Sequence, residues 1–104
     1  MTHSGIIHFI DGFKVRHPDE IIELFTCGYC YQFSLILHSR FPDSFIVYSP
    51  ESNHFACLIE KNVYDITGKI SDKKATEYWV WDRFCFYEPE QAKRIIRYCI
   101  KKEE

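Results

Sequence analysis

Residues 54–60 constrain the fold of this chain most, because their side chains alternate as the residues of a strand do. Alternate residues would face opposite sides of that strand: His54, Ala56 and Leu58 on one side, and Phe55, Cys57 and Ile59 on the other. Lys61 and Asn62 suit a tight turn, and residues 63–66 would return as a partner strand that ends before Gly68. The sequence therefore predicts an antiparallel hairpin in the second half of the chain.

Helical patterns lie on both sides of this hairpin. Residues 18–26 begin with proline and two acidic residues, which suits a helix start, and Gly28 breaks the pattern. A second helix is predicted over residues 29–39, because apolar positions recur at helical spacing and Pro42 prevents continuation. A third helix is predicted to begin near Pro89. Its apolar stripe consists of Ala92, Ile95, Ile96, Cys99 and Ile100.

Shorter segments complete the expected fold. Residues 6–10 are predicted to form a short strand, and residues 45–48, which are β-branched and aromatic, a second one followed by a turn. Residues 69–77 are polar and fit a loop or a short helix, whereas the aromatic segment 79–86 fits a strand or an irregular core segment. Helices, an antiparallel meander and a final helix follow one another, so the predicted fold class is α+β.

Composition narrows the functional classes. At 104 residues, with 46% hydrophobic and 17% aromatic residues, the chain is predicted to be a single domain (1–104) with a compact core. A net charge of −2 without a large block of one sign predicts no general electrostatic footprint for nucleic acid or membrane surfaces. No signal-peptide pattern or bilayer-length apolar run is visible, so the five cysteines are expected to be reduced thiols in the cytoplasm.

Cys30 is the principal candidate nucleophile. A thiol attacks as the thiolate, and the N–H groups of a helix N-terminus stabilise that anion. Gly28 would permit the sharp turn into the helix, and the N–H of Cys30 or Tyr31 would point to where an oxyanion forms. A cysteine taken alone is more often an ordinary buried residue. The histidine and aspartate that follow Cys30 favour the functional interpretation.

His54 and Asp65 are the candidate partners of this thiol. His54 opens the predicted hairpin and Asp65 closes it eleven residues later, so both would lie toward the same end of the two strands. The carboxylate could then accept the proton of one imidazole nitrogen and fix the tautomer, while the imidazole stabilises the thiolate and moves its proton. Taken alone, Asp65 would instead be a strand-end carboxylate that caps Gly68.

The chain resembles papain-like proteins in the broad sense, a group that includes thiol proteases, NlpC-type peptidoglycan peptidases and transglutaminase-like domains. The segments that carry this resemblance are CGYCYQFSLIL (27–37), NHFACLI (53–59) and VYDITG (63–68). In that group, a Cys that begins a helix is followed by a strand His and by an Asp, Asn or His on the next strand, which is the order of Cys30, His54 and Asp65.

Within this group, the sequence is most similar to small phage and prophage proteins of about the same length. The shared motifs are Gly28-Tyr29-Cys30, Asn53-His54-Phe55, Tyr64-Asp65-Ile66-Thr67-Gly68 and Arg94-Ile95-Ile96-Arg97-Tyr98-Cys99-Ile100. Asn53 departs from those proteins, which tend to have Gly there. Papain-like proteases usually carry a Gln a few residues before the Cys as an oxyanion donor, but residues 23–26 contain none, so backbone N–H groups or Thr26 would have to serve.

The resemblance implies a small thiol hydrolase of phage or prophage origin. Cys30 would attack the acyl carbon of a peptide or isopeptide amide, His54 would act as general base and then acid, and Asp65 would orient the imidazole. Deamidation and acyl transfer would use the same groups. No cofactor or metal is expected, and the partner would be a protein or peptide substrate or a host protein rather than a nucleic acid or a membrane. The oligomeric state is left open.

Two other functions are compatible with these residues. A catalytically inactive papain-like module would bind and inhibit a host defence protein. A zinc-stabilised interaction domain would use two pairs with zinc-knuckle-like spacing: Cys27 with Cys30, and His54 with Cys57. Strand alternation disfavours zinc because it places His54 and Cys57 on opposite faces. Cys27 and Cys30 also have the spacing of a redox pair, although no strand is predicted directly before them. The remaining cysteines are predicted to be core residues: Cys57, Cys85 and Cys99.

Overall fold

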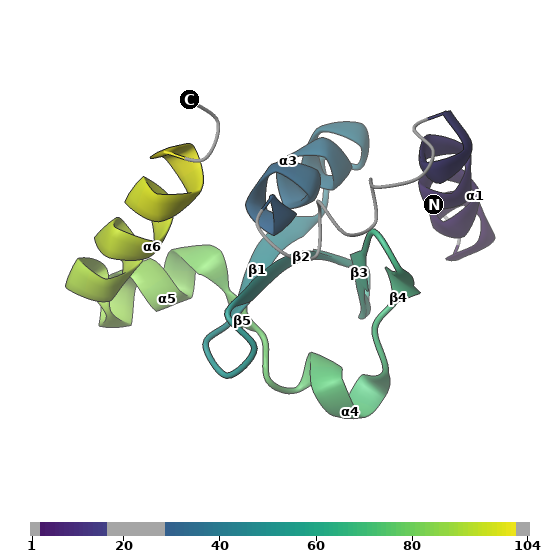
Figure 1. Cartoon of the computed structure of the whole chain (residues 1–104). Coiled ribbons are helices and arrows are strands. Elements are labelled where there is room, and N and C mark those ends of the chain that lie inside the picture. Colours follow the sequence, from purple (N-terminus) through teal and green to yellow (C-terminus); the bar gives the residue numbers. More distant parts are fainter. Residues whose placement is uncertain (1–2, 17–28, 102–104) are drawn as a thin grey trace.

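The computed structural model of this chain describes residues 3–16 and 29–101, and this part is an α+β structure, as the sequence predicts (Figure 1). Its helices are α1 (His3–Arg16), α3 (Cys30–Arg40), α4 (Asp72–Ala75), α5 (Trp81–Tyr87) and α6 (Pro89–Lys101). Its strands are β1 (Phe45–Ser49), β2 (His54–Ile59), β3 (Asn62–Asp65), β4 (Gly68–Lys69) and β5 (Trp79–Val80). Within the described residues, the strands form one antiparallel sheet in the order β4-β3-β2-β1-β5.

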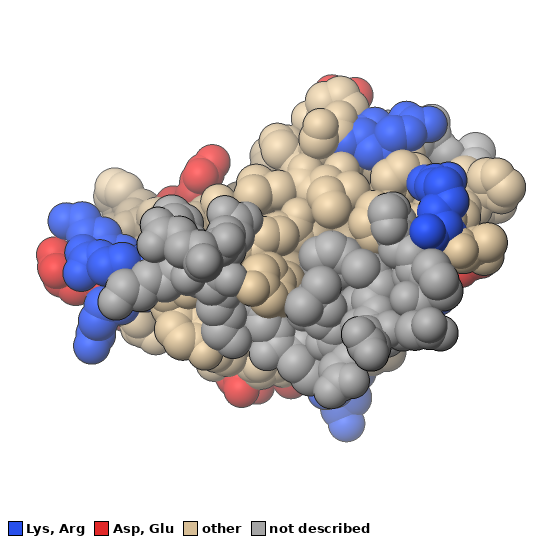
Figure 2. Space-filling model, turned by 45° about the horizontal axis from the view of Figure 1, so that its top comes forward, with Lys and Arg blue, Asp and Glu red and all other residues tan. Residues whose placement is uncertain are grey.

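The helices lie around this sheet in a simple arrangement. Figure 1 shows α3 above the sheet and α4 below it, with α1 beside β4 and with α5 and α6 beyond β1 and β5. On the face that Figure 2 draws, the basic and acidic side chains of the described residues are intermixed around the margin. In the described part of the chain, no helix is long and apolar enough to cross a membrane.

The central hairpin sets the register of the sheet. β1 pairs with β2 from Phe45 opposite Leu58 to Ser49 opposite His54. The pairing of β2 with β3 includes Ile59 opposite Asn62, so the tight turn consists of residues 60–61. The prediction of a turn at Lys61 and Asn62 is therefore wrong by one residue. Glu60 adopts a φ of +59°, and this left-handed conformation permits the chain to reverse before Asn62.

Two hydrophobic clusters lie on the face of the sheet that α3 covers. The first joins α1, α3 and the strands β2 and β3: Ile6, Ile10, Phe33, Leu37, Phe41, Cys57, Ile59, Tyr64 and Ile66. The second joins the sheet to α5 and α6: Tyr48, Phe55, Trp81, Phe84, Ala92 and Cys99. Cys30 and Tyr31 pack against this second cluster. The start of α3 is therefore anchored between the two clusters and the sheet, which is where the candidate site residues lie.

The opposite face carries a smaller cluster of Val47, Ala56 and Val63. Leu58, Ile70, Ala75, Tyr78 and Val80 pack against it, and Ala75 belongs to α4. The alternation predicted for residues 54–59 is confirmed, since Ala56 and Leu58 contribute to this face and Phe55, Cys57 and Ile59 to the other.

Several elements agree with the sequence. The predicted helix over residues 29–39 is α3, the strand over residues 45–48 is β1, and the helix beginning at Pro89 is α6. The described part of the α6 stripe packs on the second cluster, with Ala92 and Cys99 buried and Ile95 and Ile96 half-buried. Residues 69–77 contain the short helix α4. The helix predicted over residues 18–26 and the turn at Gly28 lie outside the described residues.

One predicted strand is wrong. Residues 6–10 belong to the helix α1, in which Ile6 and Ile10, four residues apart, are both buried against the sheet. A short apolar run fits either periodicity, and here the one-turn spacing of the two isoleucines determines which residues reach the core. The aromatic segment 79–86, which the sequence left undecided, divides into the two-residue strand β5 and the helix α5.

Candidate active site

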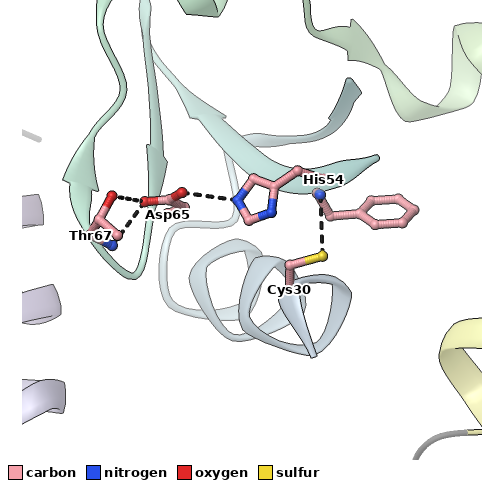
Figure 3. A network of polar contacts seen from close by, with 5 residues as sticks. Cys30, His54, Asp65 and Thr67 are labelled. Atoms are coloured by element: carbon pink, nitrogen blue, oxygen red, sulfur yellow. Dashed lines mark hydrogen bonds and ion pairs between the residues drawn. The ribbon is translucent and has the colours of Figure 1, made fainter. Parts of the chain in front are cut away.

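Cys30 is the first residue of α3, as the sequence predicts. Tyr29 precedes it as the N-cap residue and provides no side-chain cap, and the first intrahelical bond runs from Phe33 N to Tyr29 O at 3.2 Å. The backbone N–H groups of the first turn have no intrahelical acceptor, and a hydrogen bond from the Tyr31 backbone to the Cys30 thiol contributes to lowering the pKa of this thiol. The N–H of Phe55 on β2 also donates to Cys30 Sγ, at 3.4 Å (Figure 3). Two elements thus direct N–H groups at the sulfur position.

His54 and Asp65 lie next to each other at the end of the hairpin. His54 is the first residue of β2 and Asp65 is the last residue of β3. The β2–β3 register, continued by one residue, places Asp65 opposite Ala56, and thus diagonal to His54 on the same face. His54 Nε2 and Asp65 Oδ2 are 2.9 Å apart, and their side chains are only 13% and 12% exposed. The structure thus brings this pair together in a largely buried contact.

The imidazole of His54 links the carboxylate to the thiol. With Nε2 directed at Asp65, the other ring nitrogen lies on the side of Cys30 (Figure 3). A hydrogen bond between the His54 and Cys30 side chains affects the pKa of both residues. Cys30, His54 and Asp65 therefore form one chain of contacts from α3 through β2 to β3.

Thr67 holds the far oxygen of Asp65. Its backbone N–H donates to Asp65 Oδ1 at 2.8 Å, and its hydroxyl donates to the same oxygen (Figure 3). The alternative considered for Asp65 taken alone is a local cap of Gly68, and the structure differs in the donor, since both of these local bonds come from Thr67, two residues after the aspartate. The signal was present in the sequence, since an aspartate commonly bonds the backbone two residues further on.

The contacts between these groups outweigh the effect of burial on their charge. Burial would raise the pKa of the Cys30 thiol, but hydrogen bonds from His54 and from the Phe55 N–H, together with the charge on His54, lower this pKa. Burial would lower the pKa of His54, whereas hydrogen bonds to Asp65 and Cys30 raise it to about 9. Between the two pKa values, the site holds a thiolate next to an imidazolium.

Asp65 stays ionised throughout this range. Burial would raise the pKa of its carboxyl group, but the hydrogen bonds from His54 and Thr67 lower it. The Asp65 carboxylate is therefore negative wherever the imidazolium exists, and its charge favours the protonated ring. Such an arrangement supplies a nucleophilic sulfur and a proton donor to the same reacting group.

Two tyrosines lie beside the site. The Tyr78 ring stands edge-on to the His54 ring with 6.5 Å between the centroids, and burial, with the charges of Asp65 and Glu77, raises the Tyr78 pKa to about 12. Tyr48 donates from its hydroxyl to Asn53 Oδ1 at 2.6 Å, directly before His54. Sequence reasoning did not single out either tyrosine, because each has the pattern of an ordinary core aromatic.

The structure explains why Asn53 can stand where the similar phage proteins tend to have Gly. Asn53 adopts a φ of +50°, in the left-handed region. Among residues with a side chain, asparagine is one of the few that enters this region readily. The turn before His54 therefore keeps the same backbone conformation that a glycine would permit.

The residues of the zinc alternative do not converge where they are described. His54 and Cys57 lie on opposite faces of β2, and Cys57 is buried in the first cluster. Within residues 3–16 and 29–101, no group of three or more His, Cys, Asp or Glu side chains is arranged to hold a metal ion. Cys27 lies outside the described residues. Of the predicted core cysteines, Cys57 and Cys99 are buried and Cys85 is half-buried.

The fold and the site define an α+β protein in which a cysteine, a histidine and an aspartate meet at one end of an antiparallel sheet. The family model described as Phage YunG-like protein matches residues 6–100, which is most of the chain. The chain therefore belongs to the phage YunG-like protein family and is a phage-type protein. No curated protein and no solved structure matches it.

Proposed function

We propose that this chain is a small papain-like thiol hydrolase that uses Cys30, His54 and Asp65 on an amide bond. The observation that carries the proposal is the pairing of a thiol of lowered pKa with an imidazole of raised pKa at a helix N-terminus. Charged pairs of this kind are expensive to bury and are concentrated at functional sites. An ordinary buried cysteine has its pKa raised, as Cys57 does here.

The reaction follows from the positions of the three groups. The Cys30 thiolate attacks the carbonyl carbon, a C–S bond forms, and the carbonyl oxygen becomes an oxyanion near the N–H groups of the α3 N-terminus. The His54 imidazolium gives its proton to the leaving nitrogen as the C–N bond breaks. Neutral His54 then takes a proton from water, which attacks the thioester and releases the acid and the thiolate. Asp65 keeps the imidazole oriented through Nε2.

The substrate class is an amide in a peptide or an isopeptide. Deamidation requires an amide side chain in place of the peptide bond, and acyl transfer requires an amine in place of water. The proposed setting is a reducing compartment such as the cytoplasm, because the reaction needs a free thiol. The alternative, an inactive papain-like module that blocks a host protein, predicts an unreactive Cys30 and is separated by the test below.

Selective alkylation tests the proposal directly. The protein is treated with limiting iodoacetamide near pH 6, and the modified cysteine is identified by mass spectrometry. Cys30 should react much faster than Cys85, the internal control, whose pKa is raised by burial and by the charge of Asp82. The alkylation rate follows the fraction of thiolate. His54→Ala should therefore slow the alkylation of Cys30 by about tenfold for each unit by which the pKa of the Cys30 thiol rises.

The outcome decides between the alternatives. If Cys30 reacts no faster than Cys85, or no faster than a thiol in the unfolded chain, the hydrolase proposal fails and the inactive binding module takes its place. Zinc measured in the same sample at about one equivalent per chain would favour the zinc-stabilised domain instead. Fast labelling that depends on His54 supports the hydrolase.

A further inference from the structure

We propose that Thr67 is a positioning residue for the site, acting through Asp65 on the imidazole and so on the thiol. This inference rests on the proposed function and deepens it. A carboxylate has two equivalent oxygens and can rotate about its last bond, so a strand-end aspartate does not by itself select which oxygen faces its partner. In this chain, the two donors of Thr67 make that selection.

Both donors of Thr67 converge on one oxygen. The backbone N–H and the hydroxyl each donate to Asp65 Oδ1, and Oδ2 is left for His54 Nε2 at 2.9 Å. Asp65 is only 8% exposed, so an Oδ1 without donors would be a buried charge with unmet hydrogen bonds. Thr67 thus stabilises the ionised carboxylate and also fixes its plane, while its own side chain stands at the surface.

The loop that carries Thr67 is held from both sides. Asp65 pairs with Gly68 across the β3–β4 turn, so residues 66–67 form a two-residue connection. Ile66 is fully buried in the first cluster, beneath α1 and α3. Gly68 has a φ of +113°, a conformation that residues with a side chain rarely adopt. The buried isoleucine and the glycine conformation fix the turn, and the turn presents both Thr67 donors to the carboxylate.

Removing the Thr67 hydroxyl should change the pKa of Cys30 through the charges on Asp65 and His54. Loss of the Thr67 hydroxyl would make the Asp65 carboxylate less stable, weaken its hold on the imidazolium and thereby raise the pKa of the thiol. The titratable groups close to Asp65 are His54 and Tyr78, and Cys30 acts on both of these. On the strand and the helix beside β3, Lys69 is paired with Asp72 at 2.9 Å in an exposed contact. Tyr78 keeps its proton below about pH 12.

The test is the pH profile of Cys30 alkylation in Thr67→Val and Thr67→Ser, compared with wild type and Asp65→Asn. Valine keeps the shape of threonine but removes the hydroxyl, whereas serine keeps the hydroxyl. Thr67→Val should move the profile to higher pH and lower the rate at pH 6 by about threefold or more, with rates converging above pH 9. Thr67→Ser should stay within about twofold of wild type.

The remaining outcomes are equally decisive. If Thr67→Val has the wild-type profile while Asp65→Asn is shifted, the positioning role is overturned and the proposed function stands. The role is also overturned if serine and valine shift the profile equally, because the hydroxyl is then irrelevant. If Asp65→Asn and His54→Ala leave the profile unchanged, the proposed function itself fails. Thermal unfolding checks each fold, and Thr67→Ala provides the same contrast if the valine variant does not fold.

Discussion

Replacing Cys30 by serine is expected to uncover a pH dependence of stability that the wild-type protein conceals. The pKa of His54 is raised from 6.5 to about 9, so the stability that His54 contributes is complete below pH 6.5 and is lost as the pH rises through 9. The pKa of Cys30 is lowered from 9.0, so its contribution is present above pH 9 and is lost as the pH falls through the folded-state value. The two dependences have opposite signs.

In the wild-type protein, these two dependences cancel over a defined window. Above both pH 6.5 and the folded-state pKa of Cys30, and below pH 9, folding transfers a proton from the thiol to the imidazole and neither takes up nor releases one. The free energy of unfolding should therefore change little with pH there. Serine does not titrate in this range, so the Cys30→Ser variant binds an extra proton on His54 when it folds. Its free energy of unfolding should fall as the pH rises above 6.5.

The size of this decrease in the free energy of unfolding follows from the shift in the pKa of His54. The span from 6.5 to about 9 corresponds to at most about 3.4 kcal/mol for a group whose side chain is 13% exposed. The hydrogen bond to Asp65 is the larger favourable contribution to this shift and survives the substitution, whereas the contributions of Cys30 are lost. A decrease of roughly 1–2 kcal/mol between pH 6.5 and 9 is therefore expected for the variant.

Urea unfolding at pH 6, 7, 8 and 9 measures this difference for wild type and Cys30→Ser. Cys30→Ser with Asp65→Asn is the matched control and should show a much smaller slope, because the carboxylate that holds the imidazolium has been removed. If Cys30→Ser alone is equally stable from pH 6 to pH 9, Asp65 does not keep His54 protonated, and the reasoning is refuted. An equal slope in the double variant would assign the effect to a different group.

Two further predictions concern the scaffold, and urea unfolding measures both. Asn53→Ala should reduce the free energy of unfolding by about 1–2 kcal/mol, because it removes the hydrogen bond from Tyr48 and leaves an alanine side chain at a φ of +50°. Asn53→Gly also removes the hydrogen bond but adopts this φ without strain, so it should lose less stability. A larger loss for glycine than for alanine would contradict this account. Leu37→Ala should cost about 2–5 kcal/mol because Leu37 is fully buried, whereas Leu35→Ala, at a 40% exposed position of the same helix, should cost under about 0.5 kcal/mol. Equal losses would show that α3 does not pack as described.

Sequence patterns predicted the elements that carry the site because these patterns extend over whole elements. The alternation from His54 to Ile59 and the apolar spacing from Cys30 onward each involve several side chains, and both segments form as expected. The run from Ile6 to Ile10 was too short to distinguish two periodicities. Whether this segment became a strand or a helix depended on its packing in the first hydrophobic cluster, with Ile66 and other residues far along the chain. No local sequence pattern reveals such packing.

The contacts of Asp65 illustrate a different limit of prediction from sequence. The sequence placed His54 and Asp65 toward the same end of a hairpin, and the structure brings them to 2.9 Å. The role of Thr67 was missed because an aspartate at a strand end has several local donors within reach, and the turn conformation selects among them. Likewise, the N–H of Phe55 is directed at Cys30 because of where α3 docks, which is a tertiary property.

The turn at residues 60–61 decides whether the site can exist. With this turn, Asp65 is opposite Ala56, two residues along β2 from His54, or about 7 Å along the strand. A turn at Lys61 and Asn62 would keep Asp65 on the same face but place it opposite Leu58, about 13 Å along the strand from His54. At that separation the imidazole could not meet the carboxylate, and the hydrogen bond that does most to raise the pKa of His54 against the effect of burial would be lost. The left-handed conformation of Glu60, far from any reacting atom, therefore sets the register on which the Cys30–His54–Asp65 arrangement depends.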